Sequence, residues 1–168
     1  MAIVTSASAG LRTAQRATII QLRAPGLTTG VLEQEARELV SSVSVPVVVS
    51  SRCDVALAVG AAGVNLPERD VSVADALALL DDHLVGRSVH SIESALQAEA
   101  EGADFVIYGP VWESATHPDF IPAGLSALER VARSVGIPVL AVGGVTEERI
   151  ELCLAAGADG YAAIGLFQ

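Results

Sequence analysis

The fold is decided by residues 154–161, Leu-Ala-Ala-Gly-Ala-Asp-Gly-Tyr, because two earlier segments repeat the same pattern. The other copies are residues 57–64, Leu-Ala-Val-Gly-Ala-Ala-Gly-Val, and residues 98–106, Ala-Glu-Ala-Glu-Gly-Ala-Asp-Phe-Val. In each copy an apolar helical run stops at a glycine, which adopts a left-handed helix cap without a Cβ penalty, and a β-prone run follows. A repeated helix-to-strand unit predicts a parallel sheet of successive βα units, and the closed eight-stranded barrel is its most repetitive form.

Apolar runs bounded by Pro, Gly and Ser supply the strands of this sheet. The predicted strands are residues 2–5, 18–22, 46–50, 63–66, 84–88, 105–108, 138–142 and 160–164. Runs with apolar residues at helical spacing predict helices at residues 29–42, 54–59, 73–80, 92–100, 125–134 and 147–156. We therefore predict one α/β domain over residues 1–168, a (β/α)8 TIM barrel.

The barrel is expected to be shortened, because 168 residues compare with about 250 in a typical barrel of this kind. Only residues 10–17 remain for a reduced first helix, and no eighth helix follows the last strand. The apolar surface of strands one and eight would then lack cover within the chain. This predicts a homo-oligomer with Leu166 and Phe167 close to the contact.

Composition excludes several classes of function. The chain has 20 acidic and 10 basic residues and a formal charge of −10, which disfavours nucleic acids and anionic membranes as partners. Every cationic side chain is arginine, so no lysine is present to form a Schiff base. Cys53 and Cys153 match no metal-binding spacing and are expected to be buried, reduced thiols. With no secretory signal and no apolar run long enough to cross a membrane, we expect a cytoplasmic protein.

The active site of a βα barrel is built at the carboxyl ends of its strands. Gly143 and Gly144 follow strand seven, Thr146 begins the next helix, and Gly165 follows strand eight. Bare glycine N–H groups beside a helix N-terminus favour an anion, so these residues predict a phosphate site. The alternative is that the glycines only make tight turns.

Strands two and five each end near a pair of polar residues that are two positions apart. Gln21 and Arg23 project to one side of their strand, and inward projection would place both at the barrel mouth. Ile19 shares this parity, so the pattern leaves the direction open. Ser88 and His90 form a similar pair, for which helix capping is the alternative.

The connection 109–123 is fifteen residues long and carries Glu113, Thr116 and His117. Loops of this length between a strand and a helix are uncommon and often functional, so it is interpreted as a lid. His117 is a candidate general acid or base near neutral pH, and a solvated loop histidine is the alternative.

Several of these segments, in this order, resemble the family of thiamine phosphate synthases and TenI-type thiazole tautomerases. The resemblance spans nearly the whole chain and rests on strings at residues 20–23, 51–58, 63–66, 88–91, 108–112, 137–145 and 155–164. The string Ser88-Val89-His90-Ser91 is closer to the TenI side, whose members bind a thiazole carboxylate phosphate and move a proton without a metal.

Departures from the family pattern bear on both activities. The resemblance implies two aspartates that hold the magnesium of a pyrimidine pyrophosphate, but Ser51 occupies one position and only Asp70 remains. Two family lysines are replaced by Pro25 and, approximately, His117, and a pyrophosphate leaving group needs such charge. The catalytic histidine of the tautomerases is replaced by Pro110.

The main hypothesis is therefore a TenI-like enzyme that binds a phosphorylated thiazole and transfers a proton without a cofactor. The alternatives are a divergent thiamine phosphate synthase, with Mg²⁺ at Asp70, and a non-catalytic barrel that binds phosphorylated ligands. The candidate catalytic residues are His117, Arg23, His90 and Glu113. The candidate substrate-binding and phosphate-binding residues are Gln21, Arg23, Ser51, Asn65, Ser88, Thr116, Gly143, Gly144 and Gly165.

Overall fold

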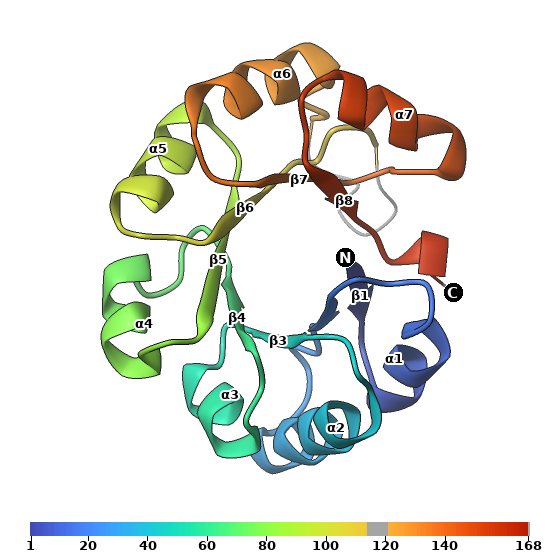
Figure 1. Cartoon of the computed structure of the whole chain (residues 1–168), viewed down its shortest axis with the longest axis vertical. Coiled ribbons are helices and arrows are strands. Elements are labelled where there is room, and N and C mark those ends of the chain that lie inside the picture. The colour runs from blue at the N-terminus through green and yellow to red at the C-terminus, as the bar shows by residue number, and fades with distance from the viewer. Residues whose placement is uncertain (114–120, 168) are drawn as a thin grey trace.

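Parallel strands and helices alternate along the chain and form a ring around one axis (Figure 1). The computed structural model describes residues 1–113 and 121–167. The strands are β1 (Ala2–Val4), β2 (Ile20–Leu22), β3 (Val47–Ser50), β4 (Gly63–Leu66), β5 (Leu84–Val89), β6 (Phe105–Tyr108), β7 (Val139–Val142) and β8 (Gly160–Ala162). The helices are α1 (Ala7–Thr13), α2 (Thr29–Ser42), α3 (Cys53–Val59), α4 (Val73–Leu80), α5 (Ile92–Ala100), α6 (Leu125–Ser134) and α7 (Glu147–Ala155).

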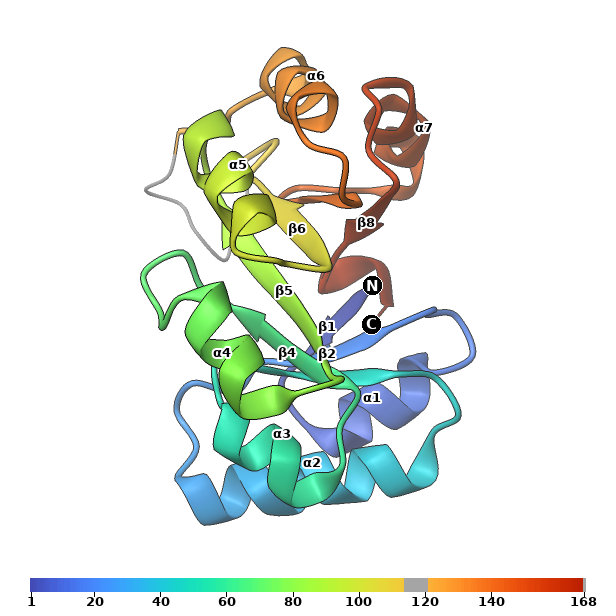
Figure 2. The same ribbon diagram turned by 60° about the vertical axis from the view of Figure 1, so that its left-hand side comes forward.

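The eight strands pair in chain order, every pair is parallel, and the first and last strands also meet. Ala2 and Ala163 form a parallel bridge, in which the Ile3 amide donates to the Ala163 carbonyl at 2.9 Å. The Ala163 amide donates to the Met1 carbonyl at 3.1 Å. The sheet therefore closes, and the predicted TIM barrel is confirmed. Figure 2 shows the helices on the outside of this ring.

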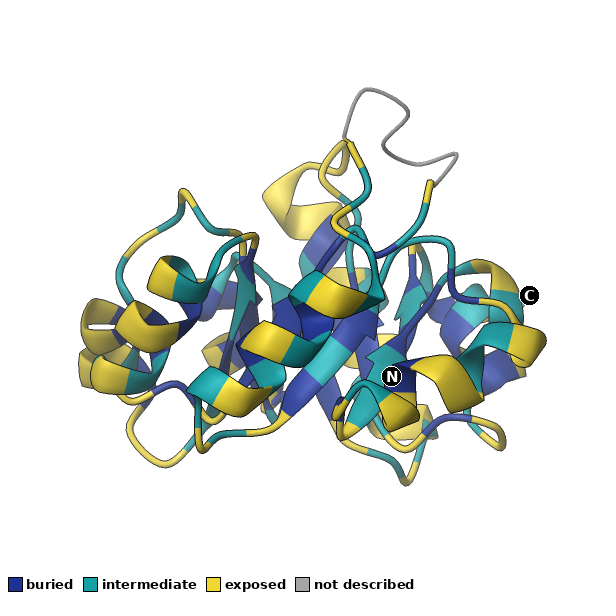
Figure 3. Ribbon diagram, turned by 90° about the horizontal axis from the view of Figure 1, so that it is seen from above, coloured by how far each residue is buried: buried dark blue, intermediate teal, exposed yellow. Residues whose placement is uncertain are grey.

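Hydrophobic side chains pack on both sides of the sheet. The larger cluster lies between the strands and the helices, whose outer faces are exposed (Figure 3). A smaller cluster fills the barrel interior and contains Met1, Val48, Phe105, Ile107 and Ala162. A Cβ atom on Gly86 would lie 2.2 Å from Phe105 Cζ, so the aromatic ring occupies the space beside this glycine. Side chains thus close part of the interior, and the room for a ligand lies at the carboxyl ends of the strands.

The glycines of the repeated helix-to-strand pattern end their helices in the predicted left-handed conformation. Gly60, Gly102 and Gly157 follow α3, α5 and α7 with φ values of 67°, 96° and 88°, which are the left-handed conformations that glycine adopts freely. The strands β4, β6 and β8 begin shortly after these glycines. The first helix was placed too late: it spans Ala7–Thr13 instead of residues 10–17. Ser6 caps it by accepting a hydrogen bond from the Ala9 amide at 3.3 Å, a start signal that the small side chains of this segment conceal.

The segment after β8 bears on the predicted oligomer. It is a 3-10 turn over Gly165–Phe167. Phe167 is only 7% exposed, and its ring lies 6.3 Å from that of Tyr161. Phe167 is thus covered within the chain, whereas Leu166 is partly exposed. The homo-oligomer remains a prediction.

The prediction for the two cysteines has a structural outcome. Cys53 and Cys153 are buried, free thiols, as predicted. Among the described residues, none of the helices combines the length and the apolar character that crossing a membrane requires.

Candidate functional site

A cavity of about 660 Å³ opens at the carboxyl ends of the strands. It is lined by residues from the ends of the strands and from the segments that follow them. Of the predicted site residues, the cavity is lined by Gln21, Arg23, Asn65, Ser88, His90, Glu113, Gly143, Gly144 and Gly165. The ring of strands therefore brings together side chains that lie far apart in the sequence.

Two buried amides face this cavity from the inner side of the barrel. Gln21 and Asn65 are 2% and 3% exposed, and both line the cavity. Ile19, which shares the parity of Gln21, packs against the interior cluster, and this resolves the direction that the sequence left open. Asn65 Nδ2 donates to Ser88 Oγ at 3.0 Å. In the described part of the chain, Gln21 Oε1 and Asn65 Oδ1 are buried without a hydrogen-bond partner.

An orphaned buried polar atom costs about 1–3 kcal/mol, so a native protein rarely keeps one without a reason. Here two such atoms belong to residues that line one cavity. Both are carbonyl oxygens, which accept hydrogen bonds. They suit a ligand that carries N–H or O–H donors.

The glycine turns after β7 and β8 line the same cavity from another side. Gly143 and Gly144 have φ values of 92° and 65°, and a Cβ on either would collide with neighbouring chain. On Gly143 it would lie 2.6 Å from Pro110 Cβ, and on Gly144 2.5 Å from the Glu113 carbonyl oxygen. Gly144 therefore serves both a left-handed turn and a close approach. The first helical turn of α7 adds amides at this place, and the side chain of its N-cap residue makes no cap hydrogen bond.

Two arginines supply positive charge to the cavity. Arg23 reaches it from the end of β2, and Arg149 reaches it from the first turn of α7. Arg149 Nη1 donates to the Gly144 carbonyl at 2.6 Å, and its guanidinium lies 5.0 Å from the centre of the Trp112 ring. Arg149 was not among the predicted site residues, because it lies on a helix and not at a strand end or in the loop that follows one. The signal available was a cationic residue three positions after the predicted helix start at Thr146.

His90 is tied to the neighbouring loops. Its Nδ1 contacts the Gly109 carbonyl, which can only accept, so Nδ1 carries a proton. Its backbone amide donates to Glu68 Oε1 at 3.1 Å. Glu68 also lines the cavity, and Arg87 Nη2 donates to the Glu68 carbonyl at 2.7 Å. Glu68 and Glu113 are thus the acidic residues of the lining.

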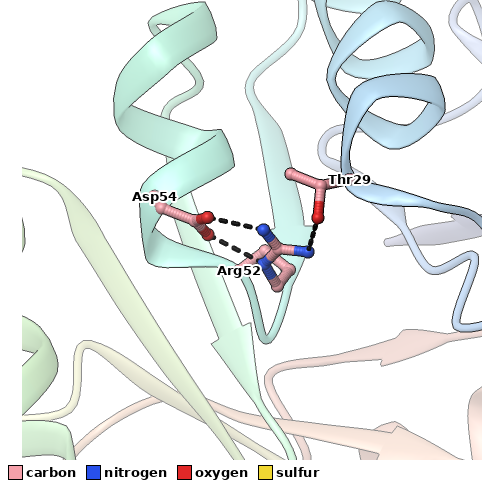
Figure 4. A network of polar contacts seen from close by, with 3 residues as sticks. All are labelled: Thr29, Arg52 and Asp54. Atoms are coloured by element: carbon pink, nitrogen blue, oxygen red, sulfur yellow. Dashed lines mark hydrogen bonds and ion pairs between the residues drawn. The ribbon is translucent and has the colours of Figure 1, made fainter.

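Ser51 and Asp70 lie beside the cavity and not in its lining. Ser51 has a φ of 72° and its Oγ donates to Asp70 Oδ2. The neighbouring Arg52 donates to Asp54 Oδ1 at 2.8 Å and to Thr29 Oγ1 at 3.0 Å, which ties the loop after β3 to the start of α2 (Figure 4). This network fixes the segment that carries Ser51.

Two pKa values near this loop are shifted, one by a hydrogen bond and the other mainly by burial. The Asp54 carboxylate accepts from Arg52, and this hydrogen bond lowers the pKa of Asp54. Burial first, and the nearby charge of Asp70 second, raise the pKa of the Cys53 thiol. Cys53 is therefore held in its protonated form near neutral pH and is a poor nucleophile.

The remaining predicted residues, Thr116 and His117, lie outside the residues that the structure describes. Their assignment as binding and acid–base groups stays a prediction. Within residues 1–113 and 121–167, no three His, Cys, Asp or Glu side chains lie together as a preformed metal centre.

Comparisons with known proteins agree with this architecture. A family model described as thiamine monophosphate synthase matches residues 3–167. The thiamine-phosphate synthase of Chloroflexus aurantiacus is 39% identical over 152 residues, which cover 88% of this chain and 70% of that protein. The thiamine-phosphate synthase of Methanoculleus marisnigri is 37% identical over 161 residues, with coverages of 93% and 76%.

A solved structure is also similar to this chain, both in fold and in sequence. Thiamine phosphate pyrophosphorylase from Pyrococcus furiosus superimposes with a TM-score of 0.88 at 30% identity, covering 98% of this chain and 84% of that one. The names of these relatives favour the synthase alternative over the tautomerase hypothesis, which they do not confirm.

Proposed function

The chain belongs to the thiamine monophosphate synthase family, and we propose that it is a synthase, which joins a pyrimidine diphosphate to a thiazole phosphate. The observation that carries this proposal is the pair of unpartnered buried amide oxygens, Gln21 Oε1 and Asn65 Oδ1, which belong to two residues that line one cavity together with a glycine-rich turn. One side of the cavity suits a polar heterocycle and the other suits an anion.

The buried amides favour the synthase over the tautomerase. The pyrimidine of thiamine carries an amino group, whose N–H donors can pair with the Gln21 and Asn65 oxygens. A thiazole carboxylate has no N–H donor on its ring, so a tautomerase substrate would leave both acceptors unpaired at a cost of about 1–3 kcal/mol each. The buried amides therefore favour the synthase, whereas the Ser88-Val89-His90-Ser91 string favoured the tautomerase.

The glycine turns suit the phosphate of the thiazole. The amides of Gly143, Gly144 and Gly165, with the first turn of α7, would supply N–H donors to phosphate oxygens. Repulsion by a chain with a formal charge of −10 would oppose an anion elsewhere on the surface. Arg23 and Arg149 provide the local positive charge.

The reaction needs only a displacement at carbon. The thiazole nitrogen donates its lone pair to the methylene carbon of the pyrimidine, the bond from that carbon to the diphosphate oxygen breaks, and diphosphate leaves with the electron pair. The protein positions the two rings and stabilises the developing charge on diphosphate. Arg23, which carries a permanent charge at the barrel mouth, is suited to that task.

Asp70 and Ser51 would hold Mg²⁺ for this reaction. Mg²⁺ is bound by oxygen ligands, and one or two carboxylates with substrate phosphates are sufficient. The contact between the Ser51 hydroxyl and the Asp70 carboxylate places two oxygen atoms that can ligate a metal close together, so the residues fit the ion. When bound, Mg²⁺ supplies neutralisation of diphosphate charge. With a single carboxylate we expect weak retention of the ion in the absence of substrate.

The direct test is to supply both substrates with Mg²⁺ and to measure thiamine phosphate. We expect turnover by the wild type and a large loss in Gln21→Leu. Gln21 carries a buried amide oxygen without a hydrogen-bond partner, and the substitution by Leu removes it. This variant should therefore fold with equal or greater stability. Gln15→Leu, at an exposed glutamine outside the cavity, is the matched control.

The outcomes separate the candidate functions. Conversion of a thiazole carboxylate phosphate without pyrimidine would favour the tautomerase. Thermal stabilisation by thiazole phosphate without any turnover would favour a non-catalytic binding barrel. Full activity in Gln21→Leu would refute the role assigned to the buried amides.

A further inference from the structure

Arg149 is joined to both walls of the proposed phosphate site. It donates from Nη1 to the Gly144 carbonyl at 2.6 Å, and its guanidinium lies 5.0 Å from the Trp112 ring centre. Trp112 in turn donates its backbone amide to the Gly143 carbonyl at 3.1 Å. The side chain of Arg149 also lines the cavity. One residue therefore connects α7, the turn after β7 and the segment after β6 at the edge of the anion site.

This arrangement leaves donors for a ligand. A guanidinium carries five N–H groups in one plane, and stacking on an aromatic ring engages its face while the edge stays available. The Gly144 carbonyl uses one of these groups.

The acidic residues that line the cavity also make a cationic side chain necessary for binding an anion. Glu68 and Glu113 line the same cavity, and both would repel an anionic ligand. The glycine turns offer N–H dipoles but no net charge. Arg149 is a cationic side chain in direct contact with one of these turns.

Resting on the proposed function, we propose that Arg149 is a phosphate-binding residue of this chain. Trp112 and the Gly144 carbonyl hold its guanidinium beside the cavity, and the in-plane N–H groups bind the phosphate of the thiazole substrate. The residue thereby sets specificity for the phosphorylated thiazole over the free alcohol.

The experiment compares two probes, thiazole phosphate and the corresponding thiazole alcohol, by calorimetric titration. Arg149→Gln should weaken binding of the phosphate about 10- to 100-fold, as expected when a hydrogen bond to a charged group is lost. Binding of the alcohol should change less than about twofold. Arg149→Lys, which keeps the charge but not the planar donor set, should recover part of the phosphate affinity.

Controls separate binding from support of the fold. Arg12→Gln, at an exposed arginine on α1, makes the same change in net charge and should leave both affinities unaltered. In steady-state kinetics, Arg149→Gln should raise KM for thiazole phosphate with little change in kcat. A purely structural clamp would instead weaken the phosphate and the alcohol equally, and that result would overturn the proposal.

Failure of the proposed function gives a different result. A wild type that binds thiazole phosphate through Arg149 but forms no thiamine phosphate would refute the synthase and keep the binding role. Unchanged phosphate affinity in Arg149→Gln, with normal turnover by the wild type, would refute only the role of Arg149. A wild type without affinity for thiazole phosphate would refute both.

Discussion

The turn after β7 gives a quantitative prediction, because Gly144 combines two constraints that can be measured separately. Its φ of 65° is left-handed, which costs an L-residue about 1–2 kcal/mol. A Cβ there would also lie 2.5 Å from the Glu113 carbonyl oxygen and 2.7 Å from Trp112 Cβ. Such overpacking costs about 1–3 kcal/mol. Gly144→Ala should therefore lose about 2–5 kcal/mol of unfolding free energy.

Gly60→Ala is the matched control for this prediction. Gly60 has a φ of 67°, and a Cβ there would meet nothing within 4 Å, so only the conformational cost applies. The difference between the unfolding free energies lost in Gly144→Ala and in Gly60→Ala gives the cost of the steric clash with the segment after β6. Urea unfolding followed by circular dichroism, with unchanged m-values, measures both free energies. At about 2–4 °C per kcal/mol, Tm should fall roughly 4–20 °C in Gly144→Ala and 2–8 °C in Gly60→Ala. Equal losses in the two variants would refute the packing geometry.

Three further predictions concern the loop after β3 and the first residue of α3. Ser51→Asp restores a second carboxylate beside Asp70, and the positive φ of this position suits Asp. Mg²⁺ should therefore raise the Tm of the variant more than that of the wild type, which a thermal-shift titration measures. Arg52→Ala should cost less than about 1 kcal/mol, since the pair with Asp54 is exposed. Because Arg52 lowers the folded-state pKa of Asp54, this stabilisation is present above the unfolded pKa, about 3.9, and disappears as pH falls through the folded pKa; urea unfolding at pH 7 and pH 3 tests it. Cys53 should react with a thiol reagent only after unfolding, and rapid labelling of native protein at pH 7 would contradict its burial.

The sequence predicted the fold well because strand formation here depends on local apolar runs. Six helices and eight strands lie close to their predicted ranges, and the repeated glycines end their helices in the left-handed conformation. The first helix was displaced because its start depends on a single side chain, Ser6, in a run of small residues. Local patterns therefore place elements well where their boundaries contain glycine or proline.

The site was predictable only in part, for a physical reason. Strand-end positions follow from the fold class, and Gln21, Asn65 and the glycine turns were found in this way. Arg149 lies on a helix, and its role depends on the distance from its guanidinium to Trp112, which is 37 residues away in the sequence. Single-sequence patterns contain no information on such a contact. The same holds for the unpartnered state of the buried amides, since it depends on every neighbouring donor.

The distribution of charge explains how a chain without lysine can serve a family whose pattern includes lysines. Pro25 and His117 stand where the resemblance implies cations, so the positive charge at the barrel mouth must come from other positions. Arg23 keeps the place directly after β2, and Arg149 adds a charge from α7, on the side of the glycine turns. Arginine suits this substitution, because its planar donors match phosphate oxygens and because the Arg149 guanidinium lies over the Trp112 ring, which restricts its position. If this exchange of cations is functional, adding lysine at Pro25 in an Arg149→Gln background should restore little affinity for thiazole phosphate. Pro25 follows β2 and is not among the residues that line the cavity, whereas Arg149 lines it from α7, and a displaced charge cannot reproduce the planar donors of the guanidinium.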